Sequence, residues 1–259
     1  MIDLREVVYA GSRNLYEHMV PAVKSLLAHT AVDRVWLLIE DDEFPYSMPG
    51  CVQTVNVGHQ TIFRGNSPNI RTWFTYVCLL RAAYSKVLPE SVETVLQLDI
   101  DTVVNDDLSP LWAIDLSDSY FAAVPEHLGG HRPYGPKYYN AGVMLINLHK
   151  VREDGVEDVM IDLLNREKLP YIDQDAWNKV GAATAIDLPV RYNECFVTGY
   201  TDHPAIVHYA GVKDWATSRS LERAEYLSAA LQLSWREVLL AQERLLNPTS
   251  PERPDTAMD

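Results

Sequence analysis

The sequence has few of the features that mark membrane-spanning, secreted or nucleic-acid-binding proteins. Its strongest apolar run, residues 141–146, is far shorter than the roughly 18 residues that a membrane-spanning helix needs. Its three cysteines, Cys51, Cys78 and Cys195, form no CxxC pair, which argues against a disulfide framework or a thiolate zinc site and for a reducing compartment. The first residues lack the basic-then-apolar order of a signal peptide. We therefore expect a cytoplasmic protein without a membrane span.

Basic residues are also scarce. The 259 residues include 22 Lys and Arg against 36 Asp and Glu, which gives a formal net charge of −14. Because affinity for a nucleic-acid backbone depends on basic patches, we expect no nucleic-acid partner. Hydrophobic residues make up 47% of the chain, enough to form the core of one large domain, alone or with a small appendage.

Short apolar segments alternate along the chain with longer segments of helical spacing, a pattern typical of an α/β fold. We predict strands at residues 6–10, 35–39, 52–57, 95–98, 121–124, 142–146 and 206–209. We predict helices at residues 19–27, 73–87 (ending before Pro89), 156–164 and 221–246, and a further helix that begins at 173. The simplest organisation is a catalytic domain over residues 1–216, a helical extension over 217–246 and a disordered, Pro-rich tail over 247–259.

The most informative feature is a pair of aspartates after the predicted strand at residues 95–98. Asp99 and Asp101 are one residue apart, so on an extended chain their side chains point to the same side, roughly 6–7 Å apart. Two such carboxylates can hold one hard divalent cation at the end of a strand, where open α/β sheets bind ligands. A cation there could neutralise the charge that develops on a diphosphate leaving group. A simple turn or a helix cap would give the same pattern.

A second enzymatic interpretation is a phosphatase. An apolar strand followed by Asp-x-Asp-x-Thr resembles the opening of the haloacid-dehalogenase phosphatases, in which Asp99 would be the nucleophile and Asp101 the proton donor. That motif normally opens its chain, whereas several predicted elements precede it here, which argues against the phosphatase.

Two further segments place carboxamides and carboxylates beside predicted elements. Asn140 precedes a strand, and the small Ala141 and Gly142 would let a ligand approach the backbone. Asp173 and Gln174 begin a helix, where they could bind carbohydrate hydroxyls or simply cap the helix.

A histidine ends the last predicted strand. His208 is followed by Gly211 and by Lys213, which can meet a phosphate. A lone histidine in such a place is usually structural. If His208 joined Asp99 and Asp101, the two carboxylates and one imidazole would suit Mn²⁺ better than Ca²⁺.

Together the four segments resemble glycosyltransferase family 8. They occur in the family's order: LDIDT, NAGVMLIN, DQDAWN and HYAGVKDW. The opening VVYAGSRNLY and an arginine upstream of the aspartate pair, Arg81, are also similar to the family. The resemblance implies a retaining, metal-dependent enzyme with the GT-A fold, a mixed and mostly parallel central sheet flanked by helices.

The resemblance also implies a donor site built from these segments. Its metal ligands, for Mn²⁺ or Mg²⁺, would be Asp99, Asp101 and His208. Its phosphate contacts would be Gly211 and Lys213. The residues around the nucleoside would be Ala10, Ser12, Asn14, Ile100 and Tyr16, the last stacking on the base. Arg81 would brace the donor, and the residues that address its sugar would be Asn140, Asp173 and Gln174.

The implied mechanism is retaining. Gln174 would lie near the reacting carbon, on the face opposite the leaving group. A carboxylate nucleophile is not obvious, which favours front-face attack by the acceptor while a phosphate oxygen of the leaving group takes its proton. Asp175 is the alternative, as the nucleophile of a covalent intermediate.

The sequence departs from the family in its first loop, in its late motif and in its tail, which is acidic and Pro-rich where membrane-facing members often have a basic, aromatic one, so we expect no membrane docking. Ser12 and Arg13 stand where the family often has an acidic residue that reads uracil, and Asp214 replaces a proline in the late motif. We expect transfer of a hexose, galactose or glucose, from a UDP-sugar to a hydroxyl of a saccharide or other acceptor. The alternatives are the phosphatase and a protein that binds a nucleotide-sugar without turnover.

Overall fold

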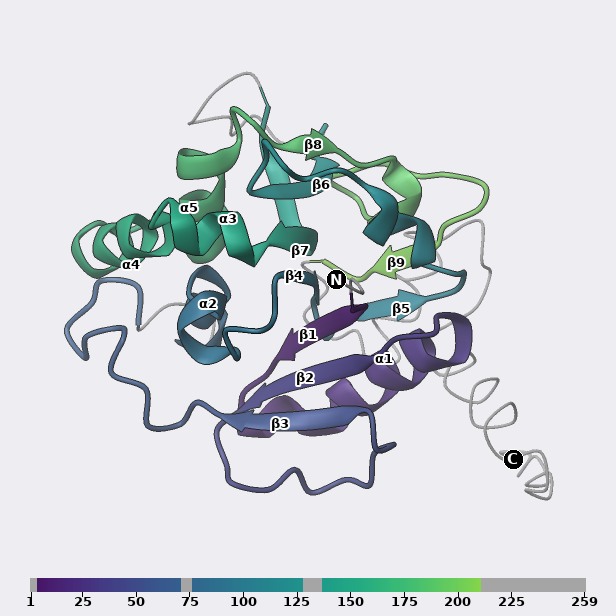
Figure 1. Ribbon diagram of the computed structural model, residues 1–259, viewed down its shortest axis with the longest axis horizontal. Coiled ribbons are helices and arrows are strands. Elements are labelled where there is room, and N and C mark those ends of the chain that lie inside the picture. The colour runs from purple at the N-terminus through teal and green to yellow at the C-terminus, as the bar shows by residue number, and fades with distance from the viewer. Residues whose placement is uncertain (1–3, 71–75, 128–136, 211–259) are drawn as a thin grey trace, which may run out of the picture.

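The computed structural model describes residues 4–70, 76–127 and 137–210. Within this part, seven strands form one sheet in the order β3-β2-β1-β4-β7-β6-β8 (Figure 1). Their bounds are β1 Glu6–Ala10, β2 Arg34–Ile39, β3 Val52–Asn56, β4 Thr94–Leu98, β6 Phe121–Pro125, β7 Tyr139–Asn147 and β8 Ile186–Asp187. Strands β1 to β4 are parallel, β7 is antiparallel to both β4 and β6, and β8 is parallel to β6. The predicted α/β fold with a mixed, mostly parallel sheet is confirmed.

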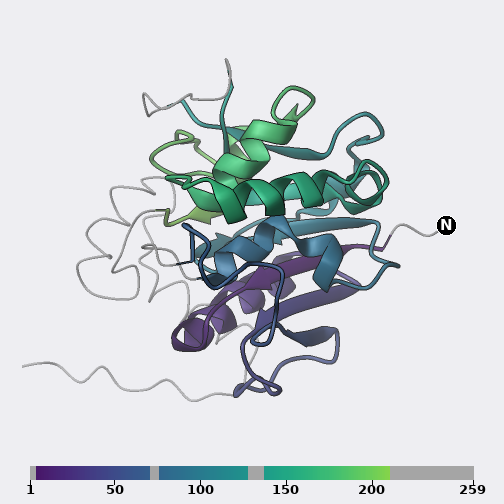
Figure 2. The ribbon, with the colours of Figure 1, turned by 90° about the vertical axis from the view of Figure 1, so that its left-hand side faces the viewer.

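Helices cover both faces of this sheet. The α-helices are α1 Tyr16–His29, α2 Tyr84–Val87, α3 Leu148–Glu153, α4 Val156–Arg166 and α5 Ile172–Gly181. Side chains alternate along β1, so Val7 and Tyr9 pack in the core cluster of α1, whereas Val8 packs in the cluster of α4 and α5. Figures 1 and 2 show α1 well apart from the group of α3, α4 and α5.

The strand order reverses between β1 and β4. From β1 the chain passes through α1 to β2 and β3 on one side, and then returns to form β4 on the other side of β1. In open α/β sheets the loops after two such strands leave in different directions and form the crevice in which ligands bind. Here those loops begin at Gly11 and at Asp99.

A second, two-stranded sheet adds one more segment to this edge. β5 (Thr102–Val104) and β9 (Ile206–His208) are antiparallel, with Thr102 paired to His208. The backbone N–H of Tyr209 also donates to the carbonyl of Asp101 at 2.9 Å. The pairing therefore brings residue 208 beside the segment that follows β4.

The predicted helix at 73–87 is partly wrong. The chain forms a 3-10 helix at Tyr76–Ala82 and then the short α2, and it ends before Pro89 as expected. Tertiary contacts fix this segment, because the indole N–H of Trp177 donates to the carbonyl of Arg81 at 3.0 Å. The elements β5, β8 and α3 were not predicted.

The predicted helix at 221–246 and the tail at 247–259 lie outside the described residues. In the described part of the chain, the helices are too short or too polar to cross a membrane.

Candidate active site

Three predicted metal ligands lie together at the carboxyl end of β4. The ligand atoms of Asp99, Asp101 and His208 all lie within 4.8 Å of one another. Nε2 of His208 is 3.3 Å from Oδ1 of Asp101 and 3.6 Å from Oδ2 of Asp99. Two carboxylates and one imidazole form a donor set that suits Mn²⁺, and the carboxylates also suit Mg²⁺.

These three groups control one another's protonation. Burial disfavours the imidazolium and is the largest single effect, but the charge and hydrogen bond of Asp101, together with the contact from Cys195, outweigh it and raise the pKa of His208 well above its usual range. Burial works in the opposite sense on Asp101, and His208 overcomes it and lowers the pKa of that carboxyl. Burial raises the pKa of Asp99, although Arg81 and His208 act against the rise. A divalent cation would replace the imidazolium proton as the partner of both carboxylates, so the donor set fits a metal.

The backbone of β7 holds the imidazole in place. A Cβ added to Gly142 would lie 2.0 Å from Cε1 of His208, so the ring occupies the space beside this glycine. The sequence suggested that Gly142 leaves room for a ligand. The structure corrects this, because the room is taken by the histidine. The carbonyl of Gly142 also accepts the backbone N–H of Asp99 at 2.8 Å.

Arg81 is the central buried cation of the site. Its Nη1 lies 2.5 Å from Oδ1 of Asp99 and its Nε lies 2.8 Å from Oδ2 of Asp173. Its Nη2 donates to the carbonyl of Ala141 at 2.9 Å. One side chain therefore ties the loop after β4 to β7 and to the start of α5.

Two carboxamides of the predicted sugar site lie in contact. Oε1 of Gln174 accepts the backbone N–H of Ala141 at 2.9 Å and the side-chain amide of Asn140 at 3.3 Å. Both carboxamides also donate to Oε1 of Glu126, at 3.0 Å from Asn140 and 3.1 Å from Gln174. Asn140 lies inside β7 rather than before it, because this strand begins at Tyr139.

Glu126 was missed by the sequence reasoning. It directly follows β6, and polar residues that follow strands were the signal that identified Asp99. Burial raises the pKa of Glu126, and the hydrogen bonds from Asn140 and Gln174 work against the rise.

The predicted cap at the start of α5 is different in the structure. Tyr171 is the N-cap residue, and Asp173 lies in the first turn with its side chain buried beside Arg81. Burial raises the pKa of Asp173 to about 7, while the charge of Arg81 acts to lower it. Ile172, just before it, has a φ of 36°, which is a strained conformation for a β-branched residue.

Asp175, the alternative nucleophile, is fully engaged. Its Oδ1 accepts the hydroxyl of Tyr138 at 2.6 Å, and its Oδ2 accepts the backbone N–H of Tyr171 at 2.9 Å. Its side chain is also buried.

The loop after β1 carries the residues predicted around the nucleoside. Ala10 ends β1, and the hydroxyl of Ser12 donates to Oδ1 of Asn14 at 2.9 Å. Tyr16 is buried, and its ring centroid lies 5.3 Å from that of Phe44. Its hydroxyl accepts the backbone N–H of Glu40 at 2.7 Å, which leaves only part of the ring to line the neighbouring hollow.

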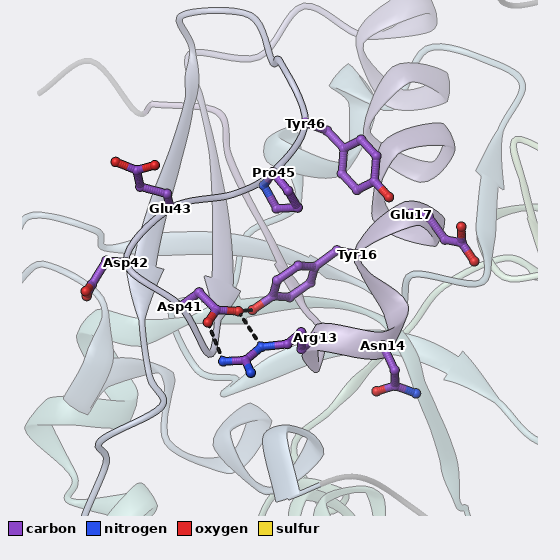
Figure 3. Close-up of a pocket in the computed structure, with 9 residues that line it drawn as sticks. All are labelled: Arg13, Asn14, Tyr16, Glu17, Asp41, Asp42, Glu43, Pro45 and Tyr46. Atoms are coloured by element: carbon purple, nitrogen blue, oxygen red, sulfur yellow. Dashed lines mark hydrogen bonds and ion pairs between the residues drawn. The ribbon is translucent and has the colours of Figure 1, made fainter.

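That hollow has a volume of about 590 Å³ and lies beyond the ends of β1 and β2. Figure 3 shows Arg13 and Tyr16 both pointing at the carboxylate of Asp41, with Tyr46 on the far side. Its acidic rim consists of Glu17, Asp41, Asp42 and Glu43.

The remaining predicted residues are placed as follows. Ile100 lies between the two aspartates and packs partly against the core cluster of α1. Gly211 and Lys213 lie outside the described residues.

The order of the central sheet and the cluster at the end of β4 agree with the GT-A fold. The model of glycosyl transferase family 8 matches residues 6–218, and the chain belongs to this family. The predicted family is thus confirmed, and the phosphatase alternative finds no support.

Relatives and solved structures agree with this assignment. The chain is 27% identical over 222 residues to a probable glycosyl transferase, Gly, of Streptococcus gordonii, covering 80% of this chain and 32% of that protein. It is 26% identical over 267 residues to glycosyltransferase GlyA of Streptococcus pneumoniae, covering 95% of this chain and 37% of that protein. This chain therefore spans about a third of the length of these two relatives.

The fold is similar to that of the galactosyltransferase LgtC in complex with donor and acceptor sugar analogs. The TM-score is 0.64 at 22% identity, with 90% of this chain and 99% of that chain covered.

Proposed function

We propose that this chain is a retaining hexosyltransferase that uses a UDP-sugar, with galactose or glucose as the hexose, and Mn²⁺. The observation that carries the proposal is the meeting of Asp99, Asp101 and His208 beside Arg81 and Gln174 at the sheet's switch point. The similarity to a galactosyltransferase and to a lipopolysaccharide 1,2-glucosyltransferase of Escherichia coli, 28% identical over 177 residues, supports both hexoses.

The metal ligands would be Asp99, Asp101 and His208, and a cation bound to them supplies charge neutralisation of the diphosphate leaving group. Arg81 fixes Asp99 in position through their ion pair. It thereby sets where one carboxylate oxygen can point, and preorganised charge of this kind is more effective than charge that must rearrange during the reaction.

On the other side of the site, Asn140, Asp173 and Gln174 would orient the hydroxyls of the donor sugar. Gln174 offers an amide, which is a poor nucleophile, and both oxygens of Asp175 are already bonded. This favours front-face attack by the acceptor hydroxyl, whose proton passes to a phosphate oxygen of the leaving group. Retention of configuration then needs no covalent intermediate.

The nucleoside would lie against the loop after β1, with Ala10, Ser12, Asn14, Tyr16 and Ile100 around it. Gly211 and Lys213 would contact the phosphates. Tyr16 is buried, with its ring against Phe44 and its hydroxyl bonded to Glu40, so little of the ring is left to stack on the base.

A panel of UDP- and GDP-sugars with Mn²⁺, scored for nucleotide release, tests the donor without knowledge of the acceptor. We expect release from UDP-galactose or UDP-glucose. Asp99→Asn and Asp101→Asn should each lower this release at least about 100-fold, because the metal is worth several kcal/mol to the leaving group. Asp118→Asn, a change in an exposed turn, is the matched control.

Release that is independent of metal, or unchanged in both variants, would contradict the proposal. Rapid hydrolysis of an aryl phosphate with Mg²⁺ and no response to UDP would instead favour a phosphatase. Binding of UDP and Mn²⁺ without any release or transfer would favour a nucleotide-sugar-binding protein.

A further inference from the structure

One buried carboxamide connects the metal cluster to the sugar side of the site. Asn193 follows the 3-10 helix Val190–Tyr192 and is completely buried. Its Oδ1 lies 2.8 Å from Nδ1 of His208, and its Nδ2 donates to Oδ1 of Asn140 at 2.9 Å. The backbone of Asn193 is held on both sides, because its N–H donates to Val190 and its carbonyl accepts the hydroxyl of Thr198.

Three hydrogen bonds connect Gly142, Asn140, Asn193 and His208 in series, and the backbone N–H of Gly142 fixes the direction of the others. The backbone N–H of Gly142 donates to the side chain of Asn140 at 2.9 Å, so the atom of Asn140 at that position must be the oxygen, Oδ1, and not the amide nitrogen. The atom of Asn193 that faces it must therefore be the donor Nδ2, which turns the oxygen of Asn193 towards His208. An oxygen at that position requires a proton on Nδ1 of the imidazole.

This requirement determines the chemistry of the other ring nitrogen. With the proton on Nδ1, a neutral His208 has its lone pair on Nε2, the atom that faces Asp99 and Asp101. Metal-binding histidines generally depend on such a partner for the second nitrogen, which fixes both the tautomer and the ring orientation.

The same series of hydrogen bonds also determines how the side chain of Asn140 is oriented on the sugar side of the site. Because Asn140 presents its oxygen to Gly142 and Asn193, its amide group must face Glu126 and Gln174. The orientation of Asn140 is thus shared between the backbone of β7 and the partner of His208.

We propose that Asn193 is a positioning residue that couples the metal ligand His208 to the sugar-binding carboxamide Asn140. The proposal rests on the proposed function, since it takes His208 as a metal ligand. Asn193 holds the imidazole with Nε2 free for the cation, and through Asn140 it aligns the group that addresses the donor sugar. Asn193 thus acts on the cation and on the donor sugar only through His208 and Asn140.

Asn193→Leu removes both hydrogen bonds at nearly constant volume. We expect the Kd for Mn²⁺ alone, measured by electron paramagnetic resonance of the free ion without donor, to rise about 10- to 100-fold. Asn69→Leu is the matched control, because Asn69 is a buried carboxamide bonded to Leu164 and Leu169 in another part of the fold. A folded Asn193→Leu protein whose Kd stays within about threefold of the original would overturn the inference.

Asn193→Asp tests the bond to His208 and the bond to Asn140 separately. It also keeps the inference testable if the leucine variant does not fold. A carboxylate still accepts from Nδ1 of His208 but cannot donate to Oδ1 of Asn140. We expect Mn²⁺ to bind no more weakly than in the unaltered protein, while kcat for nucleotide release falls about tenfold, in line with the loss of one positioned hydrogen bond. Unchanged kcat, or weaker Mn²⁺ binding, would overturn the inference. Failure of the unaltered protein to bind Mn²⁺ would instead refute the proposed function.

Discussion

Two arginines of this protein each pair with aspartate carboxylates, and their surroundings differ sharply. Arg81 contacts Asp99 and Asp173 with a side chain only 12% exposed, and the side chain of Asp173 is 4% exposed. Arg13 contacts Asp41 with both Nε and Nη2, but its side chain is 71% exposed. Both are pairs of a guanidinium with a carboxylate, but they differ in how far water reaches them, and this difference decides how much stability is lost when a pair is broken.

Burial gives the Arg81 cluster a large effect when one member is lost. The buried carboxylate of Asp173 pairs with Arg81, whereas Asp99 has His208 as a second partner 3.6 Å away. Removal of Arg81 therefore leaves the charge of Asp173 uncompensated and that of Asp99 only partly compensated. The Arg13 pair loses little on breaking, because water solvates both partners and salt screens them. Arg13 has the more favourable geometry, since two of its nitrogens contact both oxygens of one carboxylate, yet its pair is expected to contribute less to stability.

The largest effect is expected for Arg81→Met. It should lower the free energy of unfolding by about 3–5 kcal/mol at pH 8, as for other buried pairs that lose one partner. Urea denaturation measures the change. Without Arg81 the folded pKa of Asp173, about 7 in the unaltered protein, rises further, so near and above pH 7 the folded variant holds a proton that the folded unaltered protein releases. The deficit should therefore grow from pH 6 to pH 8, and a deficit independent of pH would argue against buried charge as its cause.

An intermediate effect is expected for Glu157→Gln, which tests a buried carboxylate for which the described part of the structure gives no ion pair with an arginine. Glu157 accepts the backbone N–H and the hydroxyl of Ser85, and burial raises its pKa to about 7. Its folded pKa exceeds its unfolded value, so the folded state binds more protons and stability falls as pH rises from about 4.5 to about 7.

The glutamine variant should lack this contribution, which amounts to at most about 3 kcal/mol. Thermal unfolding of both proteins between pH 4.5 and 8 is the measurement. Parallel curves for the two proteins would show that Glu157 is already ionised when folded.

The smallest effect is expected for Arg13→Met. The urea midpoint should not change measurably, because the pair is exposed and its attraction is screened. The difference between the midpoints of the two proteins should stay near zero when 0.5 M salt is added. A loss as large as that of Arg81→Met would show that the Arg13 pair is protected from water in solution and would remove the contrast between the two regions.

Much of the fold could be predicted from local patterns. The strands of the large sheet follow short apolar segments, and α1 and α4 follow helical spacing, because each pattern reflects burial of one face of one element. The segment at 76–87 was misjudged because its buried residues pack against α5, so long-range contacts rather than local spacing decide its helix type. The strand β5 was missed because its pairing partner lies about a hundred residues further on.

The candidate site divides in the same way. Asp99 and Asp101 were found because they follow an apolar strand, whose end lies at the ligand-binding edge of a sheet. His208 was assigned to them only through the resemblance to the family, because a lone histidine in a strand gives no such signal. Asn193 gives no such signal, since it follows a single 3-10 turn in an irregular segment. Its neighbours Arg191 and Glu194 are held by backbone hydrogen bonds to residues 205–208, and nothing in the sequence around residue 193 specifies those contacts.

The glycine at 142 has a consequence for how the two sheets stay together. The aspartates extend from the large sheet, whereas the imidazole belongs to the small one and rests directly on the backbone of β7. Any ion held by all three side chains would span both sheets, and its binding energy would be available only to the docked arrangement. The affinity of the ion and the docking of residues 206–208 are therefore thermodynamically linked, so that a bound ion would stabilise the small sheet in its place against β7.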